Sequence, residues 1–155
     1  MKIRFSKPKF IFPAIALYGL LSAALPGMFL PATAAADDAR QLVDLPERMQ
    51  THMLANMREH MAAIHEILDN MGRGELDVAA EIAENRLGMS AHGSHGAGHM
   101  GRRMPKDMAR LGRSMHKAAS RFALRAQEGD PLPAYRALSE VTAACVACHA
   151  GYRIR

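Results

Sequence analysis

The chain has 155 residues, enough for one domain of ordinary size, and its 20 Lys and Arg against 15 Asp and Glu give a net charge of +5. Four of the basic residues precede residue 10, so residues 37–155 hold 16 basic and 15 acidic side chains and are nearly neutral. This balance argues against a nucleic-acid-binding protein.

Residues 1–36 have the composition of an export signal. A basic start precedes an uncharged, mostly apolar run over residues 10–31, and small residues follow, with possible cleavage after Ala34 or Ala36. An uncleaved membrane anchor is the alternative, because about twenty apolar residues can cross a bilayer. The three prolines in the run favour cleavage. We therefore expect a periplasmic protein whose mature domain is residues 37–155.

Two helices are predicted in the first half of the mature domain. Residues 37–44 are polar, and we expect them to be frayed. Over residues 45–71 apolar side chains recur at steps of three and four, which predicts a long amphipathic helix that ends at the glycines that follow. A second helix is predicted over residues 75–87, with Gly88 as its C-terminal cap.

A loop rich in histidine and glycine is predicted over residues 90–103. Four glycines and three histidines fall in its first twelve residues, and this composition opposes a stable helix. His92, His95, His99 and Met100 offer imidazole and thioether groups that suit copper, and imidazole also suits zinc. The alternative is a solvated loop with titratable histidines.

The second half of the mature domain predicts two more helices. One begins near Pro105 and ends at the Gly-Asp-Pro sequence of residues 129–131, and the other continues to residue 152. No stretch of the chain alternates as a strand would. We therefore predict an all-α protein, an antiparallel up-down-up-down four-helix bundle.

The only two cysteines of the chain lie in the last predicted helix, as Cys145-Val-Ala-Cys148-His149. At this spacing two thiols can bond to the vinyl groups of a haem while the adjacent imidazole ligates its iron. On a helix these three side chains point to one side. A disulfide is the alternative in an exported protein. We predict one covalent haem c per chain, bound by the C-terminal helix.

Residues 145–153 resemble the haem motif of the class II c-type cytochromes, the cytochromes c-prime and their low-spin relatives. Residues 57–64, Met-Arg-Glu-His-Met-Ala-Ala-Ile, are similar to a segment of the first helix in that family. The resemblance implies thioether bonds at both cysteines, an axial iron ligand at His149 and a neighbour of the haem propionates at Arg153. It does not account for residues 90–104.

The ligand opposite His149 decides the function, and the resemblance places that position on the first helix near residues 54–58. A methionine there would raise the reduction potential and suit electron transfer, with Met57 as our first choice and Met53 as the second. If Leu54 blocks the position, a five-coordinate iron would bind small gases. Methionines at helical spacing can also be core filler. A bis-histidine haem is a further alternative, with its second ligand from His52, His60 or His65.

We therefore predict an exported monohaem cytochrome c that carries single electrons between periplasmic or membrane-bound redox proteins. We do not predict an enzyme, because nothing in the sequence resembles a nucleophile with its base or a pair of catalytic acids. The resemblance also suggests a homodimer through the first helices. The two alternative functions are gas binding at a five-coordinate haem and binding of copper or zinc by the loop of histidines and methionine.

Overall fold

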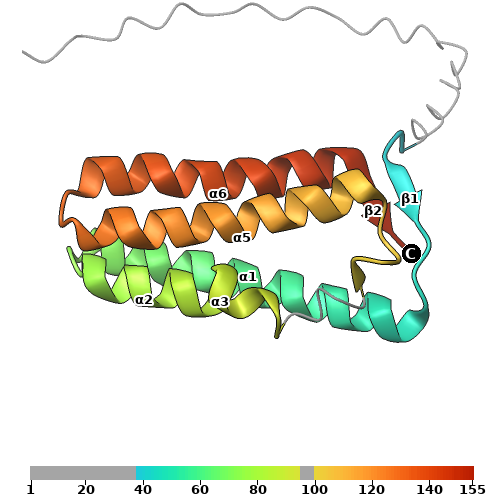
Figure 1. Ribbon diagram of the computed structural model, residues 1–155, viewed down its shortest axis with the longest axis horizontal. Helices are drawn as coiled ribbons and strands as arrows, with labels where there is room; N and C mark the ends of the chain where they lie inside the picture. The colour runs from blue at the N-terminus through green and yellow to red at the C-terminus, as the bar shows by residue number, and fades with distance from the viewer. Residues whose placement is uncertain (1–37, 95–99) are drawn as a thin grey trace, which may run out of the picture. The chain divides into compact units, whose positions relative to one another are not determined.

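The computed structural model describes residues 38–94 and 100–155, and the predicted export signal lies outside the described residues. The described chain is mostly helical, with four helices packing together (Figure 1). Helix α2 packs against α1 and α5, and α5 packs against α6. The bounds of these helices are α1 Glu47–Gly72, α2 Leu76–Arg86, α5 Lys106–Gln127 and α6 Pro131–Gly151. All four lie within a few residues of the predicted helices.

Proline, glycine and aspartate set the ends of the helices. Pro46 and Pro105 directly precede α1 and α5, where a missing backbone N–H costs nothing. Asp130 caps α6, because its carboxylate accepts a hydrogen bond of 3.0 Å from a backbone N–H in the first turn. Gly74 and Gly129 turn the chain with φ of 77° and 81°, a conformation that favours glycine.

The two ends of the described chain pair as strands, which contradicts the prediction of a frayed start and of no strand. Strand β1, Gln41–Val43, pairs in parallel with β2, Tyr152–Ile154. Tyr152 therefore belongs to a strand and not to the last helix. Val43 of β1 and Leu45, two residues further on, are buried, at 4% and 2% exposure. Three-residue strands are too short to show an alternating pattern in the sequence, so the prediction failed here.

The segment that follows α2 also differs from the predicted loop. Gly88 does not cap α2 in a left-handed conformation but precedes a single helical turn, α3, Met89–His92. A Cβ atom at Gly88 would lie 2.7 Å from the backbone oxygen of Glu84, so close approach explains the glycine. Met100 is buried, so the alternative prediction of a solvated loop is wrong at that position. His95 and His99 lie outside the described residues.

Buried side chains form two clusters, which we call the main core and the methionine core. The main core lies among the four long helices and includes Phe122, its one aromatic ring. The methionine core lies where β1, β2 and the start of α1 meet, and Cys148 packs against it. Its methionines are Met49, Met53, Met57, Met100, Met104 and Met108. The flexible thioether side chain fills such irregular space well.

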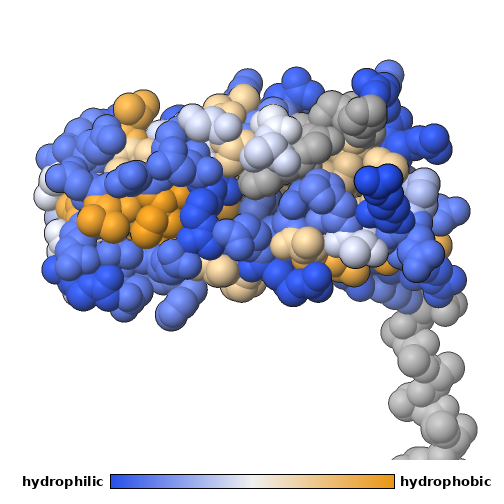
Figure 2. Space-filling model, turned by 90° about the horizontal axis from the view of Figure 1, so that it is seen from below, coloured by the Kyte–Doolittle hydropathy of each residue, from blue (hydrophilic) through white to orange (hydrophobic). Residues whose placement is uncertain are grey.

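The surface is largely hydrophilic, but the face seen in Figure 2 carries an apolar patch near one end. On α1 three large apolar side chains are exposed at intervals of seven residues, namely Leu54, Met61 and Leu68. In the part of the chain that the structure describes, no helix has both the length and the hydropathy that crossing a bilayer requires.

Candidate functional site

A cavity of about 490 Å³ lies beside the methionine core. This volume falls in the range of about 300–1,000 Å³ that is usual for small-molecule and cofactor pockets. Its walls come from α1, α3, α5, the end of α6 and β2. The lining side chains that carry chemistry are Arg40, Met53, Met57, His60, His92, Met100, Met104, Met108, Arg113, Met115, His116, Cys148, His149 and Arg153.

Most of the predicted site residues meet at this cavity. Cys148 and His149 reach it from the end of α6, and the α1 residues Met53, Leu54 and Met57 line it too. Met53 is buried at 7% exposure, Met57 is half-buried and Leu54 is 45% exposed. His149 is an exposed residue of the lining. Two segments far apart in the sequence thus line one cavity.

The two cysteines are free thiols with different surroundings. Cys148 lines the cavity and packs against the methionine core. Cys145 packs against the main core and donates a hydrogen bond of 3.4 Å to the carbonyl oxygen of Val141. Burial raises the pKa of both thiols, so both are protonated at neutral pH. A ligand bonded to both sulfurs would require Cys145 to turn from the main core toward the cavity.

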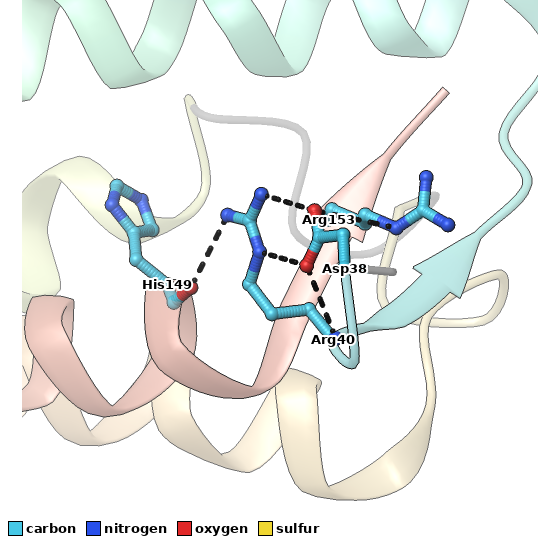
Figure 3. Close-up of polar contacts among 4 residues, drawn as sticks. All are labelled: Asp38, Arg40, His149 and Arg153. Atoms are coloured by element: carbon cyan, nitrogen blue, oxygen red, sulfur yellow. Dashed lines mark hydrogen bonds and ion pairs between the residues drawn. The ribbon is translucent and has the colours of Figure 1, made fainter. Parts of the chain in front are cut away.

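Two arginines lie at the cavity beside the last turn of α6 (Figure 3). Arg40 donates hydrogen bonds of 2.6 and 2.9 Å to the carboxylate of Asp38, and one of 3.4 Å to the carbonyl oxygen of His149. Arg153 lies 3.6 Å from the same carboxylate through its Nε. That nitrogen is buried and has no hydrogen-bond partner among the described residues. The two arginines could therefore bind a second acidic group in addition to Asp38.

The ion pair between Asp38 and Arg40 makes a contribution to stability that depends on pH and can be tested. Hydrogen bonds from the side chain and the backbone N–H of Arg40 lower the pKa of Asp38 to about 2. The pKa of Asp38 in the folded protein lies below its ordinary value of 3.8. The ionised carboxylate therefore stabilises the folded state fully above pH 3.8, and this stabilisation is lost as the pH falls through about 2. We expect an NMR titration of Asp38 to give a midpoint near 2, and Arg40→Ala to return it toward the ordinary value. The same midpoint in both proteins would contradict this ion pair.

Three histidines that line the cavity were not singled out as one group by the sequence. The sequence suggests His60 only as an alternative iron ligand and His92 only as a residue of the loop, and it gives no prediction for His116. His116 is buried at 6% exposure on α5, and the other two are half-buried. The signal for His116 was its position on the apolar face of α5, three residues before the buried Ala119.

No family model, curated protein or solved structure matches the chain. The functional conclusion therefore depends on the residues of this site.

Proposed function

We propose that the protein is an exported monohaem c-type cytochrome that carries single electrons, an up-down-up-down bundle around one covalent haem c. One observation carries the proposal: Cys148 and His149 of the Cys-x-x-Cys-His sequence line the same cavity as Met53 and Met57 of α1. A thiol, an imidazole and thioethers that line one cavity are the groups that attach and ligate the iron in such proteins.

The chemistry of the cavity fits a haem in three respects. Methionine side chains make its walls apolar, as the macrocycle requires. The attachment sequence lies at the end of α6, where the helix meets the cavity. The buried Nε of Arg153, which has no hydrogen-bond partner among the described residues, and the neighbouring Arg40 suit the carboxylates of the propionates. Cys145 is the residue that must reorient.

Each residue of the site has a defined task in this proposal. Cys145 and Cys148 would anchor the cofactor through thioether bonds, and the imidazole of His149 would ligate the iron. The haem supplies a one-electron couple. A methionine of α1 would supply a second protein ligand to the iron, and its thioether would exclude water and raise the reduction potential. Met57 remains our first choice and Met53 the alternative. Because Met53 is more deeply buried than Met57, substitutions of both residues have to be tested.

A gas-binding haem protein is the second candidate, and the position of Leu54 supports it. Leu54 lines the cavity between the two methionines on α1. If its side chain covers the iron, both methionines serve as core filler and the iron is five-coordinate. This candidate differs from the carrier in its spectrum, because a five-coordinate iron is high-spin and open to ligands.

The optical spectrum of the reduced protein distinguishes the two candidates. We expect a low-spin spectrum that carbon monoxide leaves unchanged on mixing, because a thioether already holds the sixth position. A high-spin spectrum with immediate carbon monoxide binding would contradict the electron carrier and favour the gas binder. The protein should be made in a host that attaches haem to Cys-x-x-Cys-His sequences.

The proposed partners are periplasmic or membrane-bound redox proteins. A homodimer through α1 is also proposed, because Leu54, Met61 and Leu68 form an exposed apolar row on that helix. Their spacing of seven residues is typical of helices that pack against one another.

A further inference from the structure

The charges of residues 37–155 are unevenly distributed, although their sum is close to zero. Residues 47–86, which include α1 and α2, hold eight acidic and four basic side chains. Residues 100–125, which include most of α5, hold eight basic side chains and a single acidic one, Asp107. The near-neutral total therefore conceals a strongly basic segment. A concentration of charge of one sign attracts a partner of the opposite sign.

Basic side chains form a row along one exposed face of α5. Lys106, Arg110, Arg113, Lys117 and Arg121, which we call the basic row, follow one another at steps of three or four residues. This spacing places them on the same side of the helix, and all five are exposed. At 1.5 Å per residue the row is about 22 Å long. It is too long for one small anion but matches a protein surface that carries several carboxylates.

Three members of the basic row have no carboxylate partner within the described chain. Arg110 and Arg121 form ion pairs of 3.0 and 2.7 Å with exposed carboxylates. Pairs of this kind add little to stability, so these two arginines can exchange partners. Lys106, Arg113 and Lys117 form no ion pair with any residue that the structure describes. Their charges are therefore available to a partner outside the chain.

The stability of α5 does not explain the cations at its start. The N-terminus of a helix carries a partial positive charge, so cations in its first turns are unfavourable. Lys106 is nevertheless the first residue of α5 and Arg110 the fifth, and Arg102 and Arg103 lie shortly before the helix. Asp107 is the one acidic residue of the first turn. An external acidic partner accounts for this placement better than the folding of the helix does.

The basic row lies beside the cavity proposed for the haem. A second cavity of about 490 Å³ is lined by Gly101, Lys106, Ala109, Arg110 and Arg113, and no carboxylate belongs to this described lining. Gly101, Ala109 and Arg113 line the first cavity as well. An acidic side chain bound in the second cavity would therefore hold its protein next to the first. We propose that the basic row binds an acidic surface of the redox protein that exchanges electrons with this chain, which rests on the electron carrier proposed above.

Binding of an acidic peptide to the intact mature protein tests the proposal. The probe is a fluorescein-labelled peptide of ten glutamates, and its binding is followed by fluorescence anisotropy at increasing salt concentrations. We expect saturable binding that weakens as salt screens the exposed charges. Lys106→Glu combined with Lys117→Glu should weaken it by about tenfold or more. Neither lysine lines the haem cavity, so the haem spectrum should stay unchanged.

Arg48→Glu combined with Arg136→Glu is the matched control. It makes the same change in net charge at two exposed residues outside the basic row, and it should keep the affinity of the native protein. Equal loss of affinity in both double variants would mean that only net charge matters, which would overturn the proposal. Absence of salt-dependent peptide binding would overturn it too. Binding to phosphatidylglycerol vesicles but not to the peptide would assign the row to a membrane surface instead.

Stopped-flow oxidation of the reduced haem protein tests whether the row lies where electrons leave. One electron passes from the haem iron to hexacyanoferrate(III), an anion, or to tris(phenanthroline)cobalt(III), a cation. Only oxidation by the anion should slow in the Lys106→Glu, Lys117→Glu variant, and an equal effect on both oxidants would contradict this location. The peptide assay needs no haem. A haem-free chain that binds the peptide would therefore contradict the electron carrier while the acidic partner stands.

Discussion

A C145A/C148A double variant is expected to carry no covalent haem. Each thioether bond needs a cysteine sulfur, and Cys145 and Cys148 are the only cysteines of the chain. Each single variant should retain haem through one bond at reduced yield. The measurement is haem staining of a denaturing gel, in which only covalently bound haem migrates with the chain. Circular dichroism should show that the helices persist, since alanine is the best helix former.

Val146→Ala is the matched control for the cysteine variants. Val146 lies between the two cysteines on α6 and is 68% exposed, so its truncation should leave attachment and yield unchanged. If the double variant still carried haem through denaturation, the cysteines would not be the anchors. Equal loss of haem from Val146→Ala would mean that the helix, and not the thiols, had been disturbed.

The second large effect is expected from Met57→Ala. Loss of a thioether ligand opens the sixth coordination position, so the reduced haem should convert from low to high spin and bind carbon monoxide. The reduction potential should fall, because a methionine ligand raises it. Optical spectra and a redox titration measure both changes. Met53→Ala, tested in parallel, should remain low-spin if Met57 is the ligand.

Met61→Ala on the next turn of α1 controls for general effects on the helix. Met61 is 69% exposed, so its loss should leave the spin state unchanged. High spin in the Met53 variant alone would move the ligand to Met53. Low spin in both variants would contradict a ligand at Met57 or Met53. In that case His60 becomes the first candidate, since it lines the cavity whereas His52 and His65 are exposed residues outside the described lining.

The helices could be predicted from the sequence because their signals are local. Apolar steps of three and four residues, Pro46 and Pro105 before two helices, and Gly129 and Asp130 before the last one each act within a few residues. The β1–β2 pair could not be predicted, because its two strands are three residues long and lie at opposite ends of the described chain.

The site was predictable to the extent that its chemistry lies in a short motif. Cys148 and His149 follow from their spacing, and the resemblance points to the first helix for further residues of the site. The positions of His116 and Arg40 depend on how α5 and β1 pack against the rest of the chain. A histidine on an apolar helix face gives no sign in the sequence of the rings that it will meet.

The most direct test of covalent haem attachment is the intact mass of the mature protein, purified from the periplasm of a host that matures c-type cytochromes. We predict a chain cleaved near Ala34 or Ala36 and heavier by one haem, with an alkaline pyridine spectrum typical of two thioether bonds. A mass without haem, and lower by two hydrogen atoms because Cys145 and Cys148 had formed a disulfide, would contradict this account.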